Sequence, residues 1–152
     1  MMKKRTMILV LGCLLATACS QVSINSLYNS YSREDNVEKV KINGLVMALA
    51  KPFMGKEARG FKISGIEVLS LDDCSPEVKE RFNRQALNFK DKDYELFVNS
   101  SEENEKTRIY LKFGKDFIRE IVIITIGDEP SLVHLKGKIK PSDIEKLSNG
   151  RR

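Results

Sequence analysis

The 152-residue chain holds 26 Lys and Arg residues against 21 Asp and Glu residues, a formal net charge of +5 at pH 7. Three of the basic residues lie in the first 18 positions, which hold no acidic residue, so the remainder has 23 basic against 21 acidic side chains. That near balance is typical of a mixed-charge surface and argues against a nucleic-acid-binding protein, and the length suits one hydrophobic core rather than two.

The first 18 residues have the pattern of a bacterial secretory signal. Residues 3–5 are basic (Lys-Lys-Arg), residues 7–15 form an apolar run, and residues 16–18 (Ala-Thr-Ala) supply the small side chains of a cleavage site. A permanent spanning helix needs about 20 apolar residues, so this run is too short to be one. We therefore expect residues 1–18 to be a signal peptide.

Cys19 directly follows the cleavage site, and two processing routes fit it. The stretch resembles a lipobox, in which the cysteine sulfur receives a diacylglycerol, although Ala16 stands where leucine is usual. Because a first-position cysteine is otherwise an odd choice in an exported chain, we favour lipidation of Cys19, with acyl chains such as palmitate as the anchor and residues 19–23 as the tether. Ordinary cleavage that leaves a free thiol is the alternative. Ser20 and Gln21 favour sorting to the outer membrane of a Gram-negative cell, facing the periplasm.

The next part of the chain alternates helices and strands. Residues 24–31 can form a short helix, and residues 37–42 alternate apolar with charged side chains, as a half-buried strand does. Gly44 precedes an apolar helical segment over residues 45–50, and residues 63–71 predict a second strand.

The helix that begins at Pro76 is the best signalled element. Ser75 suits the N-cap, proline suits the first helical position, and Glu77 suits the positive end of the helix dipole. We expect Glu77 to pair with Arg81 on the exposed side. The apolar side chains fall on one face: Val78, Phe82, Ala86 and Phe89.

Four strands and a short helix complete the chain. Residues 94–99 and 107–113 flank a polar turn and predict a hairpin. Residues 117–126 are apolar on both faces near their middle, which predicts a central strand. Residues 132–139 form the last predicted strand, and a short helix begins at Pro141.

The resulting order, α-β-α-β-α-β-β-β-β-α, predicts an α+β fold for a single domain over residues 24–150. We expect a mostly antiparallel sheet covered by helices, in two layers. Alternation along the last strands predicts that one side faces the core: Ile109, Leu111, Phe113, Val133 and Leu135.

The polar side of the same strands is a candidate binding face. It carries Arg108, Tyr110, Lys112, Lys136 and Lys138. Such a basic, partly aromatic face could meet an acidic partner, peptidoglycan carboxylates or anionic lipid headgroups. An ordinary solvated face of an antiparallel sheet is the alternative.

The order and spacing of several segments resemble one known family. They are SLYNSYS before VEKVKING, LVMALAKPFM, GIEVLS, PEVKERFNRQ, YELFV, RIYLKF, and IREIVIITIGDEPSLVHLKGKI with DIEKL behind it. This pattern is similar to the small bacterial lipoproteins catalogued as domain of unknown function 4252. The resemblance implies a Gram-negative envelope lipoprotein without an established biochemical activity, and it supplies no catalytic residues.

Cys74 and His134 are the one combination that could join a thiol nucleophile to an imidazole base. A helix N-terminus lowers a thiol pKa, but Asp72 and Asp73 beside Cys74 raise it. We expect a semi-buried cysteine and a histidine on the wetter side of its strand rather than a catalytic pair. One histidine and one available thiol argue against a zinc site, no phosphate-binding loop motif is present, and we expect neither a metal nor a cofactor.

The sequence therefore predicts a non-catalytic envelope lipoprotein that acts as a binding, structural or regulatory module. Its predicted partners are the membrane, through the lipid, and a further envelope protein; the sequence gives no oligomeric state. A small thiol or hydrolase enzyme using Cys74 and His134, or a carrier of a hydrophobic ligand, are the alternatives.

Overall fold

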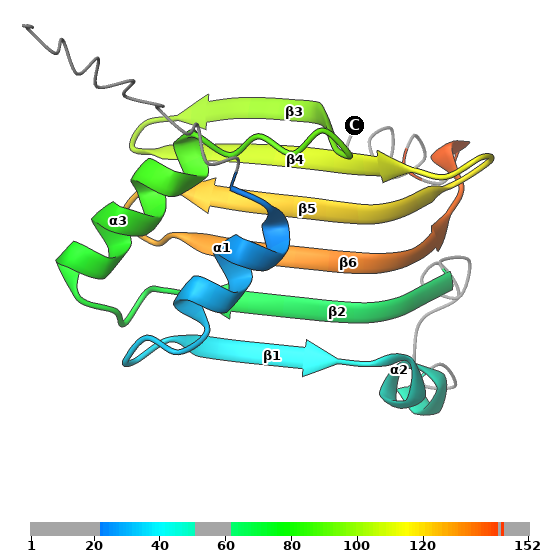
Figure 1. Cartoon of the computed structure of the whole chain (residues 1–152), viewed down its shortest axis with the longest axis horizontal. Coiled ribbons are helices and arrows are strands. Elements are labelled where there is room, and N and C mark those ends of the chain that lie inside the picture. The colour runs from blue at the N-terminus through cyan, green and yellow to red at the C-terminus, as the bar shows by residue number, and fades with distance from the viewer. Residues whose placement is uncertain (1–21, 51–61, 143, 145–152) are drawn as a thin grey trace, which may run out of the picture.

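The computed structural model describes residues 22–50, 62–142 and 144 (Figure 1). The elements are α1 (Ile24–Tyr31), β1 (Glu38–Ile42), α2 (Gly44–Ala50), β2 (Lys62–Ser70), α3 (Pro76–Leu87), β3 (Glu95–Glu102), β4 (Glu105–Phe113), β5 (Ile118–Ile126) and β6 (Ser131–Ile139). The predicted α+β class is confirmed. The predicted signal peptide and Cys19 lie outside the described residues, as does most of the predicted last helix. Within the described part of the chain, no helix is both long and apolar enough to span a bilayer.

All six strands form one antiparallel sheet in the order β1-β2-β6-β5-β4-β3 (Figure 1). Strands β3 to β6 run as a meander, because short turns join neighbouring antiparallel strands. β2 pairs with β6, so the chain must cross the sheet between β2 and β3, and α3 lies in that crossing. β5 lies between β4 and β6, as the apolar character of both its faces predicts.

Helix α3 begins as the sequence predicts. The Ser75 hydroxyl oxygen accepts a hydrogen bond from the Val78 backbone N–H at 3.4 Å, and Pro76 occupies the first turn. The predicted pair with Glu77 is wrong, because the Arg81 guanidinium instead contacts Glu34, in the loop after α1. Arg81 thereby ties α3 to the segment that follows α1.

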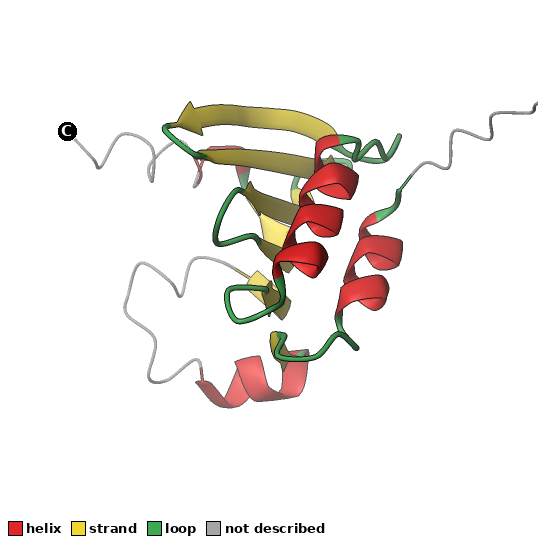
Figure 2. Ribbon diagram, turned by 90° about the vertical axis from the view of Figure 1, so that its left-hand side faces the viewer, coloured by secondary structure: helices red, strands yellow, loops and turns green. Residues whose placement is uncertain are grey.

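Helices α1 and α3 lie on the same side of the sheet (Figure 2). Between them and the strands is the main core, whose members include Leu27, Tyr31, Leu69, Phe82, Ala86, Tyr110, Val122, Ile124 and Leu132. Phe82 and Leu132 are fully buried; removing side chains of this kind from water contributes roughly 1.5–3 kcal/mol each. The two helices cover only one half of this face, the left half in Figure 1, and leave the other half open.

The predicted orientation of the last strands is wrong. Tyr110 faces the helices and is only 7% exposed, whereas Ile109 and Val133 lie half-buried on the opposite, far face. The reason is that β5 is apolar on both sides, so both faces of the sheet centre offer apolar surface. Alternation in the neighbouring strands separates two faces without showing which one the helices cover.

The far face has a smaller apolar cluster of its own. Leu111, Ile118 and Ile139 are buried there. Ile144, from the segment after β6, packs against them. Ile144 therefore covers part of the face opposite α1 and α3.

Candidate functional site

A row of charged side chains crosses the helix-covered face from β1 to β4. It consists of Lys41, Glu67, His134, Glu120 and Lys112, and we call it the charge belt. The Lys41 amine lies 2.7 Å from a Glu67 carboxylate oxygen, and the Lys112 amine lies 3.5 Å from one of Glu120. A lysine stands at each end of the row, so each of the two carboxylates has a cation beside it.

His134 is the centre of the charge belt and is only 2% exposed. Its Nε2 lies 2.7 Å from Glu120 Oε2, and its Nδ1 lies 3.3 Å from Glu67 Oε2. A carboxylate accepts hydrogen bonds, so a ring with a proton on both nitrogens satisfies both contacts. The expectation of a surface histidine is wrong, because the strand face that holds His134 turns toward the helices.

The two carboxylates of the charge belt are held in the ionised form. Burial alone would raise the pKa of Glu120, but hydrogen bonds from Tyr94 and His134 and the charge of Lys112 lower it below its ordinary value. Burial would also raise the pKa of Glu67, but hydrogen bonds from Lys41 and Lys136 lower it below its ordinary value.

Tyr94 and Asp93 extend the charge belt beyond β4. The Tyr94 hydroxyl donates to Glu120 Oε2 at 2.6 Å; burial, and then this carboxylate, raise the tyrosine pKa. Burial would lower the pKa of Lys112, but Glu120 and Asp93 raise it, with Asp93 Oδ2 3.3 Å from the amine. The segment before β3 is thereby fastened to the middle of the sheet.

Cys74 lies in the loop between β2 and α3 and is 6% exposed. Its thiol donates to the Asp35 carbonyl oxygen at 3.5 Å. Burial and then the charge of Glu34 raise the thiol pKa, with smaller contributions in the same direction from Asp73 and Asp72. The structure therefore does not bring Cys74 and His134 into contact: the thiol faces a backbone carbonyl, and the imidazole faces two carboxylates.

The five residues of the predicted binding face are not gathered on one open surface. The Arg108 guanidinium donates to the Leu87 carbonyl oxygen at 2.9 Å, beside α3. Tyr110 is in the core, where its ring packs edge-on against Phe89. Lys112 belongs to the charge belt. Lys136 and Lys138 line one open hollow, whereas Arg108 and Tyr110 line a different one, beside the end of α3.

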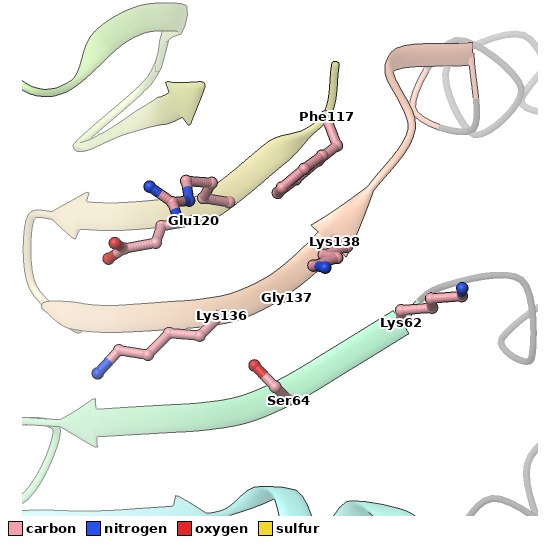
Figure 3. Close-up of a pocket in the computed structure, with 8 residues that line it drawn as sticks. Lys62, Ser64, Phe117, Glu120, Lys136, Gly137 and Lys138 are labelled. Atoms are coloured by element: carbon pink, nitrogen blue, oxygen red, sulfur yellow. The ribbon is translucent and has the colours of Figure 1, made fainter. Parts of the chain in front are cut away.

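The hollow that Lys136 and Lys138 line lies where β5 begins and β6 ends, on the half of the sheet that α1 and α3 leave uncovered in Figure 1; Figure 3 shows its lining. It has a volume of about 440 Å³, and we call it the basic hollow. Its lining residues come from β2, β6 and the start of β5: Lys62, Ser64, Phe117, Arg119, Glu120, Lys136, Gly137 and Lys138. Four cations and one carboxylate thus surround a small, open space.

Irregular strand pairing shapes the floor of the basic hollow. The register shifts between Ile63 and Gly65 in β2 and between Ile118 and Glu120 in β5, so bulges redirect the side chains there. A Cβ on Gly137 would lie 2.4 Å from the Lys62 carbonyl oxygen. Only glycine permits this close approach of β6 to β2.

Acidic side chains gather at the other ends of the strands. A hollow between the β3–β4 and β5–β6 turns is lined by Glu102, Glu103, Asn104, Glu105, Asp128 and Glu129. The basic hollow lies where β2 and β5 begin and β6 ends. The sheet therefore has a cationic end and an anionic end along its strand direction.

Sequence reasoning missed Glu67, Tyr94 and Lys62. For Glu67, and likewise for Glu120, a signal was available: each is a single acid inside an apolar strand, in GIEVLS and in IREIVIITI, and a charged residue is rarely buried without a partner. The pattern did not show which partners the strand pairing supplies.

Residues 31–147, which include the whole charge belt and all of the basic hollow, match the family model described as Domain of unknown function (DUF4252). Comparison with the curated proteins and comparison with the solved structures each find no match.

Proposed function

The chain belongs to the DUF4252 family, and we propose that it acts as a non-catalytic binding module that a lipid on Cys19 holds at the membrane of a Gram-negative envelope. One observation carries the proposal: the two side chains suited to nucleophilic chemistry are both enclosed by structural contacts. His134 has a carboxylate on each ring nitrogen, and the buried Cys74 thiol has a raised pKa. Among the hollows of the described surface, one is lined mainly by cations.

The anchor rests on the N-terminal sequence. A basic start, a short apolar run and Ala-Thr-Ala precede Cys19, and helix α1 begins five residues after it, at Ile24. Several acyl chains hold a protein stably at a membrane. Because Ser20 and Gln21 rather than aspartate follow the cysteine, we place the protein at the outer membrane, facing the periplasm.

Intact mass spectrometry of the mature protein tests the anchor. We expect the mass of a chain that starts at Cys19 plus acyl groups, and we expect the protein in the outer-membrane fraction. A Cys19→Ala variant should lose the added mass and leave the membrane fraction. A wild-type chain that starts at an unmodified Cys19 would refute the anchor.

The non-catalytic proposal has a separate test. A Cys74→Ser variant keeps a small polar side chain at the buried site and removes the thiol. In cells that depend on the protein, we expect this variant to support growth or envelope integrity as the wild type does, provided that its abundance is equal. Loss of function at equal abundance would favour the thiol enzyme instead.

A further inference from the structure

Among the described residues that line the basic hollow, four cations face one carboxylate. Within the described part of the chain, no carboxylate lies within ion-pair distance of Lys62, Arg119 or Lys138. Lys136 is paired, at 3.2 Å, with Glu67 in the charge belt. Cations that outnumber the carboxylates around them create a local positive potential, which an anionic ligand relieves.

The remaining lining suits a phosphate ester better than a bare ion. The Lys138 amine lies over the Phe117 ring, 5.4 Å from its centre, so an apolar surface adjoins the cations. Ser64 adds a hydroxyl group on the neighbouring strand (Figure 3). A volume of about 440 Å³ is within the range of small-molecule sites and exceeds what one inorganic anion needs.

The proposed anchor lies near this hollow. Ser23 and Ile24, at the start of α1, line a second hollow together with Glu120 and Lys136, and both of these also line the basic hollow. Cys19 precedes Ser23 by four residues, a span of roughly 14 Å at most. A lipid on Cys19 would therefore bring the membrane surface close to the basic hollow.

The charge asymmetry of the sheet favours the same orientation. With the basic hollow toward an anionic membrane, the acidic turns that hold Glu103 and Asp128 lie at the opposite ends of the strands. Basic residues near a membrane are attracted to anionic lipids, and acidic residues are repelled by them.

We propose that the basic hollow binds the phosphate group of an anionic phospholipid in the leaflet that holds the lipid on Cys19. Lys62, Arg119 and Lys138 contact the phosphate, and Phe117 contacts the glycerol region. The location of the lipid rests on the proposed anchor, whereas the affinity for phosphate rests on the hollow alone.

Lysine acetylation, read by mass spectrometry on the full mature protein in vesicles, tests this site. The vesicles are phosphatidylcholine, or phosphatidylcholine with one third phosphatidylglycerol. We expect Lys62 and Lys138 to react about fivefold more slowly with phosphatidylglycerol present, about the effect of one favourable charge contact. Lys90 and Lys92, exposed beside α3 and away from the hollow, are the matched controls. Equal rates in the two vesicles, or equal protection of all four lysines, would overturn the proposal.

A third sample contains inorganic phosphate with phosphatidylcholine vesicles and separates the two sources of phosphate. Protection by inorganic phosphate without protection by phosphatidylglycerol would assign the hollow to a soluble phosphate compound and overturn the headgroup assignment.

Flotation of the full chain that carries Cys19→Ala measures how strongly the basic hollow binds vesicles when no lipid anchor contributes. On phosphatidylglycerol vesicles, adding Lys62→Gln and Lys138→Gln should weaken binding about 25-fold, and adding Lys90→Gln and Lys92→Gln should leave it almost unchanged. Equal losses in the two pairs would refute a specific site. Failure of the anchor alone appears differently: the wild-type chain would lack acyl mass and would not float with pure phosphatidylcholine.

Discussion

Replacing His134 by leucine should expose how strongly the charge belt holds the sheet together. Leucine has a similar volume and can fill the buried position, but it donates to neither carboxylate. Glu67 and Glu120 would then face an apolar side chain, with 10% and 22% of their own side chains exposed. Breaking a buried ion pair on one side costs roughly 3–5 kcal/mol, because the partner charge stays buried.

The lower end of that range applies here, because each carboxylate keeps other partners. Glu120 retains Tyr94 and Lys112, and Glu67 retains Lys41 and Lys136. We therefore expect a loss of about 3 kcal/mol in the free energy of unfolding at pH 7, or about 10 °C in Tm for a chain of this length.

The loss should depend on pH in a defined direction. The folded-state pKa values of Glu67 and Glu120 are lowered, so their contribution to stability is present above the unfolded value of about 4.3 and is lost as pH falls through the folded-state values. The His134→Leu variant removes part of that lowering. The difference in the free energy of unfolding between wild type and variant should thus have its full size at pH 7 and shrink below about pH 4.5.

Thermal unfolding of the mature protein, followed by far-ultraviolet circular dichroism at pH 7 and pH 4, measures both effects. A Glu120→Gln change in the leucine variant supplies the matched double mutant, and it should restore part of the stability because the carboxylate charge is gone. A cost below about 1 kcal/mol at pH 7, or an equal cost at both pH values, would refute the role assigned to the charge belt.

Three further outcomes follow from single contacts. Gly137→Ala should cost more than about 2 kcal/mol in thermal unfolding, because its Cβ would lie 2.4 Å from the Lys62 carbonyl oxygen; the same change at Gly65, where the nearest atom is at 3.5 Å, should be tolerated. Asn83→Leu should cost roughly 1–3 kcal/mol, since it removes both hydrogen bonds to the Gly127 backbone, and the exposed Arg84→Gln control should change the unfolding free energy by less than about 0.5 kcal/mol. Cys74 should react with iodoacetamide at pH 8 far more slowly in the folded than in the unfolded protein, and titration of the unfolded mature chain should find one thiol if Cys19 is lipidated and two if it is not.

The elements were predictable because their signals are local. Helix α3 begins where Ser75 and Pro76 predict. The hairpin break between Glu102 and Glu105 lies inside the predicted turn, residues 100–106, and is shorter than predicted because both strands extend into it. The central place of β5 also follows from the sequence, since a strand that is apolar on both sides must be covered on both sides.

The side that the helices cover was not predictable by the same means. Tyr110 was expected on a solvated face, yet its ring packs in the core against Phe89. An amphipathic side chain fits either side of a sheet, and the choice depends on what the helices pack against.

The site depends on strand register, which no single strand contains. Glu67 pairs directly with His134, and Glu120 pairs with Lys112, only because β2, β6, β5 and β4 align in one register. The bulge that includes Arg119 and the close approach at Gly137 then decide which cations reach the basic hollow. These are long-range properties of four paired strands. The sequence therefore identified the lysines but could not show which of them lie together in the folded protein.

The charge belt explains how one sheet face can hold a dry core beside an open, cationic half. Leu132 and Val122 lie two positions from His134 and Glu120 on the core side, whereas Lys136 faces the basic hollow on the other side. A core that ended directly at that hollow would expose apolar side chains to water and leave the cations without local partners. Alternating charges at the boundary remove both costs, because they are satisfied by one another and still accept the Lys136 amine. A buried ion network is weak evidence for stability in itself. Its position at this boundary indicates that its main effect is to keep the open half of the sheet polar, and therefore available to a charged ligand.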